Sequence, residues 1–304
     1  MKVNALNGII PVRKEPGMTS HDVVAKIRKL LMLKKVGHTG TLDPEVEGVL
    51  PICLGQATKL SNYIMELPKS YHGQLKIGIS TTTQDFTGEI IEEKKVSNLS
   101  EEEIDSVFKS FIGEIEQIPP MYSSIKIKGK KLYELARQGK EVERKPRKVT
   151  IYDLQVTGFD LNKNDPTIDF NVSCSKGTYI RTLCVDIGER LGYPAHMSKL
   201  IRTKSGSFTL KESYTLSEIE DLIQDNKIHE ILIPMAKALP HLKEVVLSEE
   251  EIESKVYNGK KLFLNTLSTH DGVIKIVNET GELIALYETQ NNDKKAIPKR
   301  VFKM

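Results

Sequence analysis

Residues 36–59 contain the feature that most limits how this chain can fold, a single carboxylate in a glycine-framed loop. Asp43 is followed by Pro44, which pushes the preceding residue out of the helical region and fixes its backbone as extended or turned. Gly40 and Gly48 permit tight bends and a close approach of the backbone to a ligand. The stretch is therefore predicted to be a rigid loop that presents Asp43.

Asp-Pro and glycine are also ordinary turn residues, and the residues alone leave that alternative open. Two features favour a functional loop. The run after Gly48 is too apolar to be only a surface loop, and His38 lies close to Asp43 in the sequence.

The composition, 39% hydrophobic and 28% charged, is that of a soluble globular protein with an ample core. Its 304 residues are enough for one large and one small domain, or for two of similar size. The sequence has no apolar run of about eighteen residues that could span a bilayer. The N-terminus lacks the basic-then-apolar pattern of a signal peptide. We therefore expect a cytoplasmic protein without a membrane partner.

The cysteines Cys53, Cys174 and Cys184 are odd in number, and their spacing fits neither a zinc site nor a disulfide framework. All three lie in apolar stretches, which predicts small buried hydrophobic side chains. We expect no metal.

The net charge of +3 is unevenly distributed along the chain. Residues 126–148 contain ten Lys or Arg and three Glu, so this block carries +7 and the rest of the chain −4. A basic block in an otherwise slightly acidic protein is typical of a surface that contacts a phosphate backbone. A solvated charged surface is the alternative.

Hydrophobic periodicity and capping residues predict an alternation of strands and helices. Strands are expected at 8–14, 71–79, 149–159, 168–174, 273–277 and 283–287. Helices are expected after an N-cap at Thr19 or Ser20, over 56–67, after Ser100 with Ile112 on the apolar face, over about 179–191, after a Ser217–Glu220 capping box, and after Ser248.

Three stretches of the sequence resemble the motifs of TruB-type tRNA pseudouridine synthases. The first is Lys-Glu-Pro-Gly-Met-Thr-Ser at 14–20. The second is Gly-His-Thr-Gly-Thr-Leu-Asp-Pro at 37–44, continued by Gly-Val-Leu-Pro-Ile-Cys-Leu-Gly-Gln-Ala-Thr-Lys at 48–59. The third is Gly-Thr-Tyr-Ile-Arg-Thr-Leu at 177–183. The resemblance covers nearly the whole chain.

The resemblance implies a catalytic site made of Asp43, Tyr71 and Arg181. Asp43 would be the catalytic carboxylate, Tyr71 would stack on the target base and act in proton transfer, and Arg181 would pair with Asp43. A cation in the first turn of a helix is unfavourable without an anionic partner, so the position of Arg181 asks for such a pairing.

The resemblance also implies contacts to the substrate. The residues concerned are His38, Asp85, Tyr179, Leu200, Lys130 and Arg137. Asp85 would organise the arginine, Leu200 would line the base pocket, and the basic segment 119–148 would grip the RNA stem and loop.

The sequence departs from the family pattern in two places. Ile201 replaces an expected arginine, and Glu45 and Glu47 stand where a more apolar run is usual. We interpret both carboxylates as solvent-facing.

The implied fold is α+β, a pseudouridine synthase fold with a mixed, mainly antiparallel sheet flanked by helices. The catalytic domain would span 1–240 and include the basic segment as an insertion. Residues 241–304 would form a small PUA-like β-barrel that binds RNA.

The implied reaction is the isomerisation of uridine 55 in the TΨC arm of tRNA, without a cofactor or metal and without a required protein partner, in a monomer. Attack of Asp43 on C1′, addition to uracil C6 and a base role at C2′ all remain open. The alternative functions are a non-catalytic RNA-binding or tRNA-folding protein, an RNA-guided synthase, and an Asp-dependent hydrolase.

Overall fold

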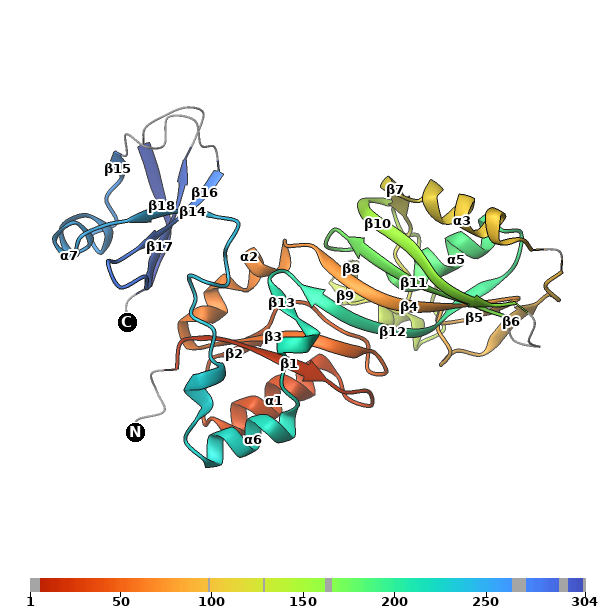
Figure 1. Cartoon of the computed structure of the whole chain (residues 1–304), viewed down its shortest axis with the longest axis horizontal. Coiled ribbons are helices and arrows are strands. Elements are labelled where there is room, and N and C mark those ends of the chain that lie inside the picture. Colours follow the sequence, from red (N-terminus) through yellow and green to blue (C-terminus); the bar gives the residue numbers. More distant parts are fainter. Residues whose placement is uncertain are drawn as a thin grey trace. The chain divides into compact units, whose positions relative to one another are not determined.

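The computed structural model describes residues 6–97, 99–127, 129–161, 166–263, 272–289 and 295–302 (Figure 1). Contacts divide the chain into two compact units. The first comprises Met1–Glu45, Val49–Met65 and Ser207–Met304, and the second comprises Val46–Gly48 and Glu66–Gly206. Among the described residues, no helix is both long and apolar enough to cross a membrane. The predicted domain boundary after residue 240 stays a prediction.

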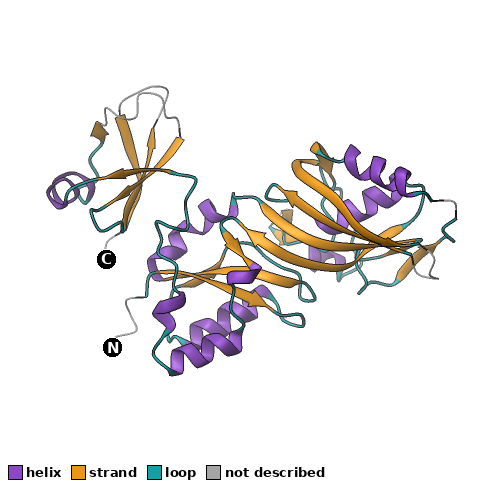
Figure 2. Cartoon of the chain, viewed as in Figure 1, coloured by secondary structure: helices purple, strands orange, loops and turns teal. Residues whose placement is uncertain are grey.

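The second unit is built on a mainly antiparallel sheet in the order β12-β4-β11-β10-β7 (Figure 2). The first two residues of β3 add a short parallel pairing, in which Glu47 and Gly48 face Ile201 and Arg202. The mixed, mainly antiparallel sheet predicted from the sequence is therefore confirmed. The strands are β4 (Lys69–Ile77), β7 (Gly113–Gln117), β10 (Arg147–Asp160), β11 (Thr167–Cys174) and β12 (Ala195–Ser205), with β3 at Glu47–Leu54.

Helices α3 (Glu101–Ser110) and α5 (Ile180–Arg190) cover one face of this sheet (Figure 1). The rings of Phe108 on α3 and Phe170 on β11 lie with their centroids 5.9 Å apart. Because every second residue of β11 is buried, its apolar side chains meet the helices while polar ones face away. Smaller elements of this unit are β5 (Ile79–Thr81), β6 (Ile90–Glu93), β8 (Lys126–Ile127), β9 (Lys130–Lys131) and α4 (Leu132–Ala136).

In the first unit, β1 and β2 pair with β3, and helices α1 and α6 lie side by side (Figure 1). Helix α1 starts at the Thr19 N-cap, whose hydroxyl accepts from the Asp22 N–H, and it buries Val23, Val24 and Ile27. The elements are β1 (Gly8–Lys14), α1 (Ser20–Leu30), β2 (Val36–His38), η2 (Gly55–Leu60), α2 (Ser61–Met65), β13 (Phe208–Thr209), η3 (Leu210–Glu212), α6 (Leu216–Gln224) and η4 (Ile228–Ile231).

The C-terminal part of the first unit is a curled five-stranded sheet in the order β14-β16-β17-β18-β15, a half-barrel consistent with the predicted PUA-like domain (Figure 2). Phe302, Val277 and Leu286 from this part share a hydrophobic core with Ile9 and Leu60. The elements are β14 (Lys243–Val246), α7 (Glu249–Glu251), η5 (Ile252–Val256), β15 (Leu262–Phe263), β16 (Gly272–Val277), β17 (Leu283–Thr289) and β18 (Lys295–Val301).

Two sequence predictions of local structure were wrong. Helix α6 is capped by Thr215, whose capping box uses Glu218, because Leu216 and Ile219 are the buried pair and the cap must precede both. Ile112, predicted on the apolar face of α3, lies beyond the end of that helix and is 45% exposed.

The three cysteines are buried and free, as predicted. Burial raises the pKa of Cys53 to about 12 and that of Cys174 to about 11, so both thiols stay protonated at neutral pH. They behave as apolar packing residues.

Candidate active site

The Asp43 loop is held by backbone contacts on both sides of the carboxylate. On one side, the Leu42 N–H donates to Ser20 Oγ over 2.9 Å, and the same hydroxyl donates to the Leu42 carbonyl at 3.2 Å. On the other side, the Pro44 carbonyl accepts from Lys14 Nζ at 2.7 Å. These contacts fix the backbone of Leu42 and Pro44, the residues on either side of a partly buried Asp43.

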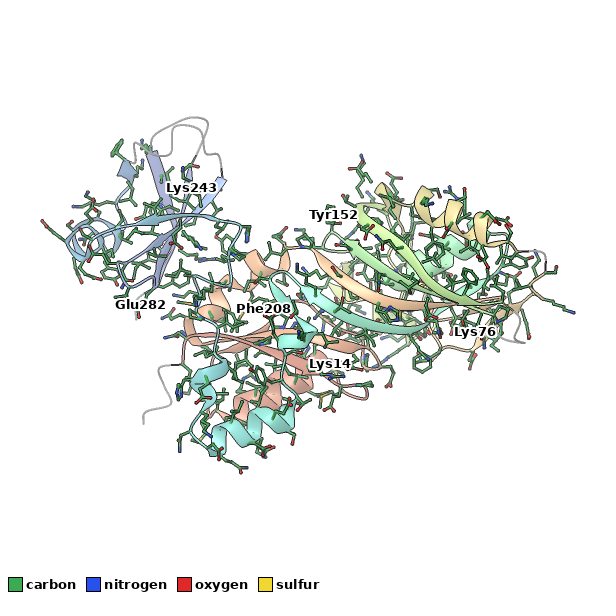
Figure 3. All side chains as sticks on the ribbon, viewed as in Figure 1. Lys14, Lys76, Tyr152, Phe208, Lys243 and Glu282 are labelled. Atoms are coloured by element: carbon green, nitrogen blue, oxygen red, sulfur yellow. The ribbon has the colours of Figure 1, made fainter. Side chains whose placement is uncertain are left out.

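Lys14 and Ser20 supply these contacts from the first motif. Lys14, labelled in Figure 3, ends β1 and is fully buried, and Ser20 is 1% exposed at the start of α1. The Gly17 N–H donates a second hydrogen bond to the Pro44 carbonyl, at 3.1 Å. The turn between β1 and α1 therefore serves as the support for the loop that follows.

His38 lies at the end of β2, just before this loop. Its Nδ1 accepts a hydrogen bond from the Gly40 N–H at 3.3 Å, which assigns the proton of the neutral ring to Nε2. The ring of His21 packs edge-on against it, with centroids 5.4 Å apart. His38 is thus oriented from both sides and is only partly buried.

Tyr71 and Arg202 face each other on neighbouring strands of the second unit. The two residues pair across β4 and β12, and their side chains are hydrogen-bonded. Arg202 is 1% exposed and is the largest fully buried side chain of the described residues. Burial disfavours its charged form and lowers its pKa, whereas Tyr71 opposes this shift. The phenol is therefore held by a guanidinium inside the sheet.

Lys69 adds a second cation next to this pair. It stands two residues before Tyr71 on β4 and is 7% exposed. Burial, followed by repulsion from Arg202, lowers the pKa of Lys69 to about 8. Two buried cationic side chains, Lys69 and Arg202, therefore lie near Tyr71.

Arg181 lies in the first turn of α5 and is 6% exposed. Its Nη1 donates to the Thr83 carbonyl at 3.0 Å, and its Nη2 donates to the Tyr122 carbonyl at 2.7 Å. Asp85 Oδ2 lies 3.9 Å from Nη1. These oxygens offset the cost of a cation at a helix N-terminus.

Asp85 is itself fixed in the polar turn 81–88. Its Oδ1 accepts from the Thr83 hydroxyl at 2.6 Å, from the Thr87 hydroxyl at 2.6 Å and from the Thr87 N–H at 3.0 Å. A carboxylate with this many donors has a fixed orientation. Asp85 is therefore held in place beside Arg181.

Tyr179 and Leu200 lie on the same unit. Tyr179 is the N-cap residue of α5, and its peptide is bound by the side chain of Gln117. Leu200 on β12 is partly buried and pairs with Gly73, whose Cα is covered by the ring of Phe170. A side chain at Gly73 would collide with that ring, at 2.5 Å.

The basic segment carries Lys130 on β9 and Arg137 just after α4, both exposed. The Arg137 guanidinium lies 5.5 Å from the ring centre of Tyr133, and Lys131 Nζ lies 5.3 Å from the same centre. Lys128 of the predicted basic block lies outside the described residues. Cations around a partly exposed aromatic ring suit a backbone and base contact.

The structure thus groups Tyr71, Arg181, Asp85, Tyr179, Leu200, Lys130 and Arg137 in the second unit, and Asp43 with His38 in the first. The pairing of Asp43 with Arg181 stays a prediction.

The sequence did not reveal the residues that hold the site residues in place, which are Lys14, Ser20, Gln117 and Arg202. Arg202 had one available signal, because this charged residue directly follows two aliphatic ones, Leu200 and Ile201. The contacts of the other three join segments far apart in sequence, which no local pattern reveals.

Family profiles match most of the chain. The N-terminal domain of TruB family pseudouridylate synthase matches residues 28–180, and the C-terminal domain of tRNA pseudouridylate synthase B matches residues 181–248.

Curated relatives match over nearly their full length. The tRNA pseudouridine synthase B of Staphylococcus saprophyticus is 50% identical over 303 residues, which are 97% of this chain and 99% of that protein. The protein of the same name from Bacillus pumilus is 51% identical over 287 residues, 93% of each chain.

Solved structures also match. A Cbf5-Nop10-Gar1 complex has a chain that is 29% identical, with a TM-score of 0.75 over 98% of this chain and 84% of that one. An H/ACA RNP bound to a substrate RNA containing 2′-deoxyuridine gives 27% identity and the same TM-score, over 100% and 87%. The fold class predicted from the sequence is confirmed.

Proposed function

Because this chain belongs to the TruB family of pseudouridylate synthases, we propose that Asp43 is the carboxylate with which it isomerises uridine 55 of tRNA to pseudouridine. The single observation that supports this role is the double clamp on the loop. The backbone groups of Leu42 and Pro44, the two neighbours of Asp43, are bound by Ser20 and Lys14, so the carboxylate is presented from a preorganised backbone.

The reaction conserves the atoms of the nucleoside apart from an exchanged proton. The C1′–N1 bond breaks, the uracil turns while it stays bound, and a C1′–C5 bond forms. The proton on C5 leaves to solvent, and N1 gains one. Asp43 would act on C1′, on uracil C6 or at C2′, and each of these routes requires the ionised carboxylate.

Tyr71 and Arg181 are proposed to complete the site. The target base must leave the stack of the TΨC arm, and Tyr71 offers an aromatic face for the extruded uracil. Arg181 is proposed to favour the ionised form of Asp43 and to orient it. The buried cations Lys69 and Arg202 near Tyr71 are compatible with an anionic RNA substrate close to this strand.

We propose that the base pocket is lined by His38, Tyr179 and Leu200. The stem and loop of the RNA are bound by Lys130 and Arg137. A detached uracil must be kept in place until it rejoins the sugar, and a closed, rigid pocket achieves this. We propose that the enzyme works on tRNA in the cytoplasm as a monomer, without a guide RNA or protein partner. The near full-length match to the bacterial relatives supports this reading.

The test is tritium release from a tRNA transcript labelled at uracil C5. We expect the wild-type enzyme to release tritium in proportion to one uridine per tRNA. The same transcript with cytidine at position 55 should release none. Binding without release from either transcript would contradict the proposed function and leave an RNA-binding protein.

A further inference from the structure

Gln117 binds both backbone polar groups of one residue, Tyr179, at the start of helix α5. Its Oε1 accepts from the Tyr179 N–H at 3.0 Å, and its Nε2 donates to the Tyr179 carbonyl at 3.2 Å. The side chain is 2% exposed. A carboxamide is the side chain that can offer one acceptor and one donor to a single residue in this way.

Tyr179 is the N-cap residue of α5, and its own side chain makes no capping hydrogen bond. Its N–H would otherwise lack an intrahelical partner, because the first N–H groups of a helix have none. Gln117 therefore fixes the position at which α5 begins. Arg181 follows two residues later, in the first turn of α5. Its backbone position therefore depends on where Gln117 holds Tyr179.

The two segments meet a second time at Arg181. Gln117 ends strand β7, and Tyr122 follows five residues later, at the root of the basic segment 119–148. The Tyr122 carbonyl accepts from Arg181 Nη2 at 2.7 Å. The start of α5 and the root of the basic segment are thus joined twice, through Gln117 to Tyr179 and through Arg181 to Tyr122.

We propose that Gln117 is a positioning residue for Arg181: its carboxamide holds the Tyr179 peptide and thereby keeps the guanidinium against the carbonyls of Thr83 and Tyr122. This inference rests on the role proposed above for Arg181. Gln117 contacts neither RNA nor base in this account. Replacing Gln117 should lower the turnover rate because Arg181 is then displaced. The affinity for tRNA should change less.

The substitution Gln117→Glu gives a specific signature. The new carboxylate keeps the acceptor but loses the donor, and it places negative charge against the Tyr179 carbonyl. When the introduced carboxyl takes up a proton, it again offers a donor and an acceptor. The variant should therefore recover as the pH falls. Gln117→Leu, which offers neither group, should not recover.

The experiment measures single-turnover pseudouridine formation and tRNA affinity between pH 6 and pH 8. We expect Gln117→Glu to be slower than wild type by about tenfold or more at pH 8, with the ratio to wild type rising toward pH 6. The dissociation constant for tRNA should change less than about threefold. Gln155→Glu, the same change at an exposed residue of β10, is the matched control and should follow wild type.

A Gln117→Glu enzyme with wild-type turnover at pH 8 would overturn the proposal, as would a loss confined to tRNA affinity. A crystal structure of Gln117→Glu at pH 8 tests the positioning of Arg181 independently of the kinetics. We expect the Arg181 guanidinium to leave the Thr83 and Tyr122 carbonyls, and an undisturbed guanidinium would overturn the proposal. This structural result stands even if the wild type releases no tritium, an outcome that would refute only the proposed function.

Discussion

At the residue scale, the candidate site consists of side chains whose supports are buried. Arg202 is the clearest case, because a guanidinium with 1% exposure is costly unless its donors find acceptors. The phenol of Tyr71 is one of these partners. A tyrosine that the sequence resemblance marks as functional therefore also contributes to the stability of the sheet.

Replacing Tyr71 with Phe should for this reason lower the free energy of unfolding as well as the activity. The substitution removes a hydrogen-bond partner of a buried charge, which typically costs about 1–3 kcal/mol. Thermal unfolding of the two proteins measures the effect. Tyr152→Phe is the matched control, since Tyr152 (labelled in Figure 3) is 53% exposed on β10 and its hydroxyl is free to bond to water. Equal melting temperatures for wild type and Tyr71→Phe would contradict this account of Arg202.

At the element scale, the strand β3 depends on one glycine. Gly48 has φ +143°, and a Cβ there would lie 2.5 Å from both the N and the O of Arg202. The parallel pairing of β3 with β12 brings the two backbones this close. A side chain at this position therefore separates the strands or strains the chain.

Gly48→Ala should destabilise the fold by about 1–3 kcal/mol or more, the cost of a strained backbone together with a displaced strand. The midpoint of denaturant unfolding reports the change. Gly158→Ala offers a comparison within a strand of the same unit. A Cβ at Gly158 meets only an Asp169 carboxylate oxygen, at 4.0 Å. If both variants unfold at the wild-type midpoint, the close approach of the two strands at Gly48 does not affect the free energy of unfolding, and the prediction is wrong.

Elements with strong periodicity could be predicted from the sequence, and they were. The helix predicted after Thr19 or Ser20 and the strand 168–174 match α1 and β11 within a residue or two, because burial on one face imposes their pattern. The strand 8–14 matches β1, a short apolar run that is buried on both faces. The cap of α6 was misplaced by two residues because Ser217 and Thr215 are both followed, three residues later, by glutamate. Local capping chemistry alone cannot choose between them, and the burial of Leu216 decides.

At the scale of the whole molecule, the sequence did not reveal how the chain is shared between units. The first unit is assembled from three separate stretches, and β3 starts in the second unit and continues in the first. Such a division follows from pairings between distant strands, and no boundary in composition marks it. The same holds for the supports of the site, since Gln117 and Tyr179 are 62 residues apart.

The charge distribution along the chain, in contrast, could be read from the sequence alone, and its consequence for binding can be measured. Each cation that neutralises a phosphate adds about 0.7–0.9 to the slope of log affinity against log salt concentration. A Lys130→Gln, Arg137→Gln double variant should therefore bind tRNA more weakly and with a slope shallower by about 1.4–1.8. A Lys95→Gln, Lys109→Gln variant, which removes two exposed lysines outside the basic segment, should keep the wild-type slope. Identical slopes for both variants would show that the basic segment does not contact the phosphate backbone.

The central claim is that Asp43 carries the chemistry, and Asp43→Asn tests it most directly because the change removes the charge and keeps the shape. The measurement is single-turnover pseudouridine formation on tRNA, at enzyme concentrations that saturate binding for every protein compared. We predict that Asp43→Asn binds tRNA with wild-type affinity but forms pseudouridine slower by a factor of at least about 10³. Glu45→Gln, two residues away on the exposed side of the same loop, should react like wild type. Wild-type turnover by Asp43→Asn, or loss of turnover only through loss of tRNA binding, would contradict the assignment.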